Sequence, residues 1–239
     1  MKKAARPAIF KWRQTAPELI LRAVGWYLRY SLSLRDVEEL LTERGLEADP
    51  TTIWRWVQRY GPELDQRRRR HLKPTNKSWR VDESYVRVKG RWCYLYRAID
   101  STGATIDFLL SALRDAAAAK RLFRKALSDR SHPQPRVINT DQAPIYGSAI
   151  PDIKKEGTLR RRCRHRPVQY LNNILEQDHR AIKRRVKAKQ NFREFRAARR
   201  TIAGYEAIHM IRKGQARWVS GNDVCRQNQF INKLFDLPA

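Results

Sequence analysis

Three carboxylates stand at positions where metal-dependent chemistry on phosphate esters is possible. Asp82 lies within a run rich in β-forming residues, where an unpaired buried charge is costly. Asp141 follows the short apolar run 136–140, and open α/β sheets bind their ligands at the carboxyl ends of strands. Glu176 lies in a basic segment with a helical pattern. The sequence places 58 residues between the first two acids and 34 between the last two.

Three anions converge in a folded protein only if cations share the site. Oxygen ligands favour Mg²⁺ or Mn²⁺. Two such ions, about 3.5–4 Å apart, can activate an attacking oxygen and stabilise a leaving oxygen in phosphoryl transfer. Each acid also has an ordinary interpretation: an edge-strand charge for Asp82, a turn or N-cap for Asp141, and an ion pair with Arg180 for Glu176. It is the joint pattern that points to a metal site.

The segments around these acids predict an α/β domain. Runs rich in β-formers, separated by turn residues, predict an antiparallel meander and one further short strand. The strands are expected over 79–88, 92–99, 104–110 and 136–140, with helices over 115–127 and 171–187. Strands followed by a helix, a strand and a helix indicate a mixed sheet with flanking helices.

A smaller all-α region precedes this domain. Apolar residues at helical spacing predict a helix over 34–41, after a support helix over 19–28, with Ser33 and Asp36 as a capping box. A second helix is predicted to begin with Asp49 as its N-cap and to end before Gly61.

This pair of helices is interpreted as a DNA-reading helix-turn-helix. Thr52, Arg55 and Arg59 share one face of the second helix, whereas the first helix shows acids that phosphates would repel. The alternative is a plain helical hairpin with solvated arginines. The connection over 44–49 is also longer than the usual turn of this motif.

The charge balance favours a polyanionic partner. The chain of 239 residues carries 51 Lys and Arg against 24 Asp and Glu, a net charge of +27. Such a surface favours nucleic acid, because Lys and Arg displace counterions from phosphates. No run of about 18 apolar residues predicts a membrane span, and the N-terminus lacks the apolar region of a signal peptide.

The remaining features are expected to be structural or to touch phosphate. Three widely spaced cysteines, Cys93, Cys163 and Cys225, fit a reducing cytoplasm, where the protein would associate with the nucleoid. The run 160–166 is interpreted as a phosphate contact, with a basic loop as the alternative. Trp218 and the helix expected over 191–212 are predicted to pack in the core. The expected domains are 1–65 (helical, DNA-binding), 66–77 (basic linker), 78–214 (catalytic) and 215–239 (tail).

Four segments together resemble the DDE transposases of bacterial insertion sequences, and insertion-sequence family six in particular. They are 79–90, 139–141, 171–180 and the helical pair over 33–57, with further agreement over 201–215. The resemblance implies an RNase H-like catalytic fold in which Asp82, Asp141 and Glu176 hold two Mg²⁺ or Mn²⁺ ions.

The resemblance further implies binding of an element's terminal inverted repeats, cleavage at its ends and transfer of the freed 3′-hydroxyl to target DNA. The partners would be double-stranded DNA and at least one further copy of the chain, because two ends must be joined. Lys183, seven residues after the glutamate, and its neighbour Arg184 would hold DNA phosphate; a solvated helix face is the alternative. Two other functions remain open: a non-catalytic repressor or inactive relic, and an RNase H-like nuclease without strand joining.

Overall fold

The computed structural model describes residues 7–11, 14–129, 132–168, 180, 182–186 and 192–238. The chain divides into two compact units, Met1–Leu72 with Arg196–Ala239, and Lys73–Phe195. The helix over Phe195–Arg212 therefore groups with the N-terminal residues, whereas the sequence-based boundaries put it inside 78–214. The first unit is built from two stretches of sequence that lie far apart along the chain.

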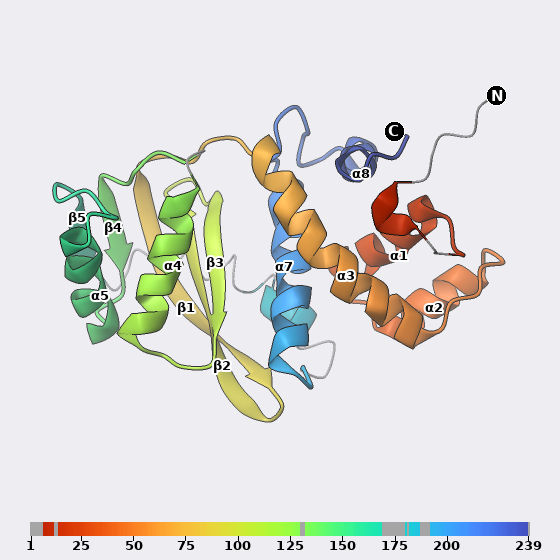
Figure 1. The fold of residues 1–239 in the computed structure, drawn as a ribbon, viewed down its shortest axis with the longest axis horizontal. Helices are drawn as coiled ribbons and strands as arrows, with labels where there is room; N and C mark the ends of the chain where they lie inside the picture. Colours follow the sequence, from red (N-terminus) through yellow and green to blue (C-terminus); the bar gives the residue numbers. More distant parts are fainter. Residues whose placement is uncertain are drawn as a thin grey trace. The chain divides into compact units, whose positions relative to one another are not determined.

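The first unit is all-α (Figure 1). Its elements are η1 (Ala8–Phe10), α1 (Pro17–Arg29), α2 (Leu34–Thr42), α3 (Pro50–Arg68), η2 (Arg69–His71), α7 (Phe195–Arg212) and α8 (Val224–Leu234). The predicted capping box at the start of α2 is confirmed, because the Ser33 hydroxyl accepts from the Asp36 N–H at 3.1 Å and the Asp36 carboxylate accepts from the Ser33 N–H at 2.7 Å. Asp49 caps α3 as predicted.

The predicted end of the second helix before Gly61 is wrong. Helix α3 continues through Gly61 and Pro62 to Arg68, and residues 66–71 of the expected linker are helical. Gly61 serves close packing: a Cβ atom there would lie 3.3 Å from the Arg200 carbonyl oxygen and 3.5 Å from the Gly204 Cα atom. A glycine followed by a proline looks, in sequence, like a helix stop, although here the glycine serves helix packing.

The expectation that Trp218 packs in the core is also wrong. Its side chain is 83% exposed, and its φ of 60° lies in the left-handed region. The Arg217 N–H donates to the His71 carbonyl at 2.8 Å, and the Val219 N–H donates to the Ala216 carbonyl. This turn holds Trp218 outward. The predicted apolar face of α7 is buried at Ile202, Tyr205 and Ile208.

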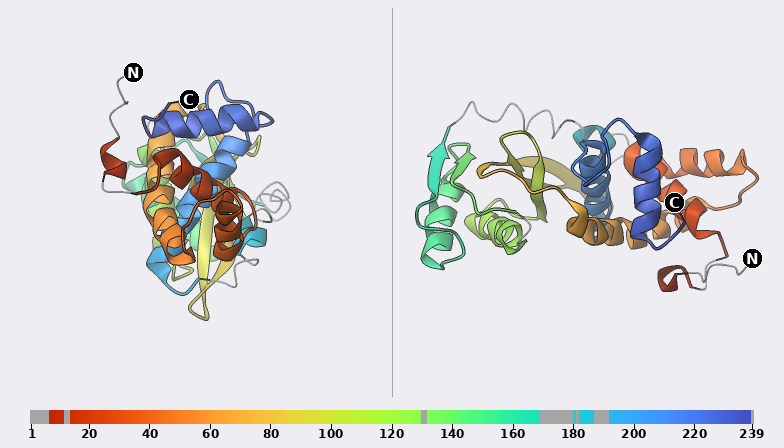
Figure 2. Two further views of the ribbon diagram at one scale, coloured as in Figure 1. Left: turned by 90° about the vertical axis from the view of Figure 1, so that its right-hand side faces the viewer. Right: turned by 90° about the horizontal axis from the view of Figure 1, so that it is seen from above.

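The second unit is a mixed sheet with helices on it (Figures 1 and 2). The strands are β1 (Ser78–Val88), β2 (Arg91–Asp100), β3 (Thr105–Ser111), β4 (Val137–Thr140) and β5 (Arg164–Pro167), in the order β3-β2-β1-β4-β5. Strand β2 is antiparallel to β1 and β3, whereas β4 is parallel to β1 and to β5. This confirms the predicted meander and the α/β fold class, with the RNase H-like architecture that the resemblance implies.

Helices α4 (Ala116–Ser128) and α5 (Pro144–Lys155) form one core with the sheet. The buried side chains come from β1, β2, β3, β4 and both helices; they include Trp79, Val81, Tyr96, Phe123 and Ile150. Burial of this apolar surface fixes the central strand β1, which carries Asp82, and its neighbour β4, which ends directly before Asp141. Among the described helices, none combines the length and apolar content needed to cross a bilayer.

Candidate active site

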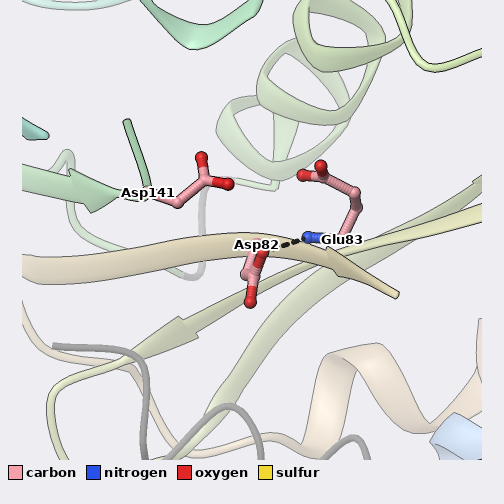
Figure 3. A group of neighbouring side chains, drawn as sticks. All are labelled: Asp82, Glu83 and Asp141. Atoms are coloured by element: carbon pink, nitrogen blue, oxygen red, sulfur yellow. Dashed lines mark hydrogen bonds between the residues drawn. The ribbon is translucent and has the colours of Figure 1, made fainter. Parts of the chain in front are cut away.

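Asp82 and Asp141 come together because their strands are neighbours. Strand β1 pairs with β4 in parallel, with Arg80 opposite Asn139. On each strand the acid lies two residues further along the chain: Asp82 within β1, and Asp141 directly after the end of β4. One carboxylate oxygen from each of Asp82, Glu83 and Asp141 lies within 4.8 Å of the others (Figure 3). The pairing of β1 with β4 thus brings together two acids that 58 residues separate in the sequence.

The electrostatics of this cluster centre on Asp82. Burial is the largest cause of a net rise in the pKa of its carboxyl from 3.8 to about 7, and the anions of Glu83 and Asp141 also contribute to this rise. The Glu83 N–H, which donates to Asp82 at 2.8 Å, and the nearby Lys183 ammonium lower it. Because the pKa still rises, these groups compensate only in part for the burial of the Asp82 charge and its repulsion by the neighbouring acids.

Glu83 is held in a network of its own. Its Oε1 atom accepts from Arg114 and its Oε2 atom accepts from the hydroxyl of Tyr146. Burial and the Glu83 charge raise the pKa of Tyr146 well above its usual value, so the phenol keeps its proton and donates it. Because both carboxylate oxygens already have partners, Glu83 is less suited to binding a cation than its two neighbours.

Arg114 links this network to Asp141. One guanidinium nitrogen lies 3.8 Å from Asp141 Oδ2, while the same group is paired with Glu83. The other Asp141 oxygen, Oδ1, accepts from the Ala143 N–H at 3.1 Å and begins the turn into α5. Asp141 is therefore both a turn residue, as its ordinary interpretation held, and a member of the acid cluster.

Strand β5 fixes the backbone at Asp141. The Thr140 hydroxyl donates to the Asp141 carbonyl at 2.7 Å, so its oxygen is left to accept from His165 Nε2 at 2.9 Å. Burial lowers the pKa of His165, and so does Lys154. A neutral imidazole with its proton on Nε2 satisfies this arrangement. The basic run 160–166, predicted as a loop or phosphate contact, thus supplies a strand that supports the site.

The other predicted residues have different positions. Glu176 lies outside the described residues. Lys183 and Arg184 are exposed on the helical residues 182–186, and Lys183 is close enough to act on Asp82. In the other unit, Arg55 and Arg59 are exposed on α3. The Thr52 hydroxyl donates to Asp49 Oδ2 at 2.7 Å and is part of the N-cap.

Sequence reasoning missed the support around the acids. Adjacent residues of a strand point to opposite faces, so sequence alone separates Glu83 from Asp82, and its carboxylate does lie on the opposite side of β1 from that of Asp82 (Figure 3). Arg114 and Tyr146 had no local signal, because only the tertiary fold brings them to Glu83. The oxygen donors of Asp82 and Asp141 fit a hard divalent cation such as Mg²⁺ or Mn²⁺.

Sequence comparison shows which known proteins the chain is similar to. A family model described as a DDE domain matches residues 76–215. The chain is 41% identical over 208 residues to the transposase for the insertion sequence-like element IS431mec of Staphylococcus aureus, covering 87% of this chain and 90% of that protein. It is 40% identical, with the same coverage, to the transposase for insertion sequence element IS257 in transposon Tn4003, also of Staphylococcus aureus.

Among solved structures, the HTLV-2 integrase catalytic core domain in complex with magnesium is similar over 61% of this chain and 95% of that chain. The sequence identity is 16% and the TM-score is 0.44.

Proposed function

Because the chain belongs to the DDE transposases of bacterial insertion sequences, we propose that it binds the terminal repeats of its element, cleaves the DNA there and joins the freed 3′-hydroxyl to target DNA. The observation that carries this proposal is the convergence of Asp82 and Asp141 from two adjacent strands. The raised pKa of Asp82 supports it, since an acid with a perturbed pKa beside a second acid that follows a parallel strand is a typical site of chemistry.

The proposed ligands are Asp82, Asp141 and Glu176, with two divalent ions. When bound, the ions would activate the attacking oxygen and stabilise the leaving one. Glu83 and Arg114 would not ligate; they would hold Asp141 at its place beside Asp82. Lys183 would contact a phosphate next to the acids, which its effect on Asp82 supports.

The first unit would supply sequence recognition. Arg55 and Arg59 are four residues apart on α3 and exposed, so one face of this helix is free for a DNA groove. Thr52 is a weaker candidate than predicted, because its hydroxyl already serves the N-cap of the helix. A transposase of this kind would act as a dimer or a larger assembly, since two element ends are joined in one reaction.

The test compares cleavage with binding. Asp82→Asn and Asp141→Asn should each abolish nicking of DNA that carries the gene's own flanks, while gel-shift affinity for those flanks stays within about threefold, because no DNA-reading residue is changed. Asp152→Asn is the matched control: its carboxylate is in the same unit, 44% exposed and paired with Lys120 at 3.0 Å. Cleavage that survives both site substitutions would remove these acids from the mechanism.

A further inference from the structure

The β1–β2 hairpin extends past the helices that cover the rest of its face (Figure 1). Alternate residues of β1 share one face of the sheet, and their exposure changes along the strand. Val81 is 0% exposed, Glu83 is 8% exposed and Tyr85 is 49% exposed. Trp92, on β2 opposite Arg87, is 59% exposed and lies beyond the last residue of β2 that pairs with β3. The core therefore gives way to an open surface within two residues of the acid cluster.

Three aromatic side chains on this open face contact one another and form what we name the aromatic strip: Tyr85, Trp92 and Tyr94. The Tyr85 ring centroid lies 6.1 Å from that of Trp92 and 5.4 Å from that of Tyr94. Tyr85 pairs directly with Tyr94 across the two strands. Rings that brace one another on paired strands are pre-ordered, so a ligand would bind with little loss of side-chain entropy.

Cations surround the aromatic strip. Arg87, Lys89 and Arg91 are exposed around the hairpin turn, and the Arg87 guanidinium lies 5.8 Å from the centre of the Trp92 ring. The sequence has no Asp or Glu between residues 84 and 99. A second copy of the same surface is a poor occupant, because a two-fold interface would set these cations against each other. Phosphates complement them.

Exposed aromatic rings beside cations are suited to single-stranded nucleic acid. The rings stack on bases, which are accessible only when they are unpaired, while the cations follow the backbone. Successive residues on one strand face are about 6.8 Å apart, so Tyr85 lies about 7 Å and Arg87 about 14 Å from Glu83 along β1. This span corresponds to one or two nucleotides next to Glu83, which shares the face of the aromatic strip, whereas the Asp82 carboxylate reaches the acid cluster from the other side of β1.

We propose that the aromatic strip binds unpaired bases of the DNA next to the phosphate on which Asp82 and Asp141 act. This inference rests on the proposed function, since it takes DNA at the acid cluster as given. It adds a binding site for single-stranded nucleotides, and it implies that the element end is locally melted when it is bound. The free energy of melting would be offset by stacking on Tyr85 and Trp92.

The experiment measures binding without chemistry, in the Asp141→Asn background. One DNA carries a fully paired element end; a second carries a three-base mismatch at the cleavage position. Trp92→Leu removes the ring but keeps an apolar side chain, Trp92→Phe keeps a ring, and Tyr85→Leu tests the second ring. Val224→Ala, another exposed apolar residue in the other unit, is the control.

We expect the parent protein to bind the mismatched end more tightly than the paired end. Trp92→Leu and Tyr85→Leu should each weaken binding of the mismatched end roughly tenfold, while Trp92→Phe and the control stay within about twofold. A 5-iodouracil placed in the mismatch should cross-link to Tyr85 or Trp92 on irradiation.

Three results would overturn the proposal: equal affinity of the parent for both ends, equal loss by Trp92→Leu and Trp92→Phe, or a change of oligomeric state in Trp92→Leu with unchanged DNA binding. The last would assign the aromatic strip to a protein interface. Because the assay reads binding in a background that lacks Asp141, failure of the proposed chemistry would leave its result intact, and the converse also holds.

Discussion

Asp82 carries a free-energy cost in the folded protein that a bound cation would remove. Its carboxyl is partly buried beside two other acids, and its pKa is raised from 3.8 to about 7. Between these two values the unfolded chain has lost a proton that the folded chain retains, so the stability of the metal-free protein falls as the pH rises from about 4 to about 7. Above that range the full cost remains.

Asp82→Asn is therefore expected to stabilise the metal-free protein. The gain in Tm should be larger at pH 8 than at pH 5, because folded Asp82 is already mostly neutral at pH 5. Each kcal/mol relieved would raise Tm by about 2–4 °C in a chain of this length. Thermal unfolding with EDTA measures both values. A Tm below that of the parent at both pH values would show that Asp82 is not a destabilising anion.

Glu83 and Asp82 should respond differently to Mn²⁺. Saturating Mn²⁺ should raise the Tm of the parent and of Glu83→Gln, but not of Asp82→Asn, because ligand binding stabilises only a fold that keeps the site. Glu83→Gln should itself cost about 1–3 kcal/mol of folding free energy, since it breaks the pair with Arg114. If Glu83→Gln abolished the Mn²⁺ effect, Glu83 would be a ligand.

At the scale of residues, the sequence predicted the two acids but not the side chains that hold them in place. Asp82 and Asp141 stood out because each acid follows or interrupts a strand pattern. Arg114 and Tyr146 are ordinary residues in sequence, and they act only because β1, α5 and the end of β3 meet. The partners of a buried carboxylate depend on tertiary packing, which residue spacing does not encode.

At the scale of helices, the first unit depends on one close approach. A Cβ atom on Gly204 of α7 would lie 2.7 Å from a Leu28 methyl and 3.2 Å from the Gly61 Cα atom. Gly204→Ala should therefore destabilise the protein by about 1–3 kcal/mol through overpacking. Gly147→Ala is the matched control: it is also a helix residue, with no atom within 4 Å of the added Cβ, and should be neutral or stabilise by up to about 1 kcal/mol.

Urea unfolding measures this difference directly. Equal effects of the two glycine substitutions would mean that the contact between α3 and α7 does not limit the packing of the first unit.

Helix α3 is expected to carry the sequence preference. Arg55→Ala should reduce discrimination between the element end and random DNA by roughly 5- to 150-fold, because base-edge contacts specify sequence. Competition binding measures the ratio, and Arg22→Ala, an exposed arginine on α1, is the control. Equal weakening on both DNAs would instead make Arg55 a phosphate contact.

Local signals predicted most elements well. Ser33 and Asp49 are N-caps as expected, and the strand meander has its predicted order. Helix α5 was not predicted, because Gly147 and Pro151 lie inside it. Strand β5 was missed because it has no apolar alternation; its side chains are mostly exposed, and it is held by backbone pairing with β4.

At the scale of the molecule, sequence order and spatial order differ. The predicted domains follow the chain, whereas the first compact unit joins Met1–Leu72 to Arg196–Ala239. Pairings such as that between Gln58 and Thr201 at 2.8 Å connect the two stretches. Composition divides the chain into contiguous segments, so it does not predict that a C-terminal stretch joins the same compact unit as the N-terminal stretch. The net charge of +27, in contrast, pointed to nucleic acid before any element was assigned.

The central claim is that this chain joins DNA strands by means of the site around Asp82 and Asp141. The most direct test mixes the purified protein with DNA carrying the gene's flanks, a target plasmid and Mg²⁺ or Mn²⁺, beside an Asp141→Asn control. We predict covalent joining of an end's 3′ strand to the target, dependent on metal and absent in the control. Specific binding of the flanks with no cleavage or joining in either metal would contradict the claim and favour a non-catalytic DNA-binding protein.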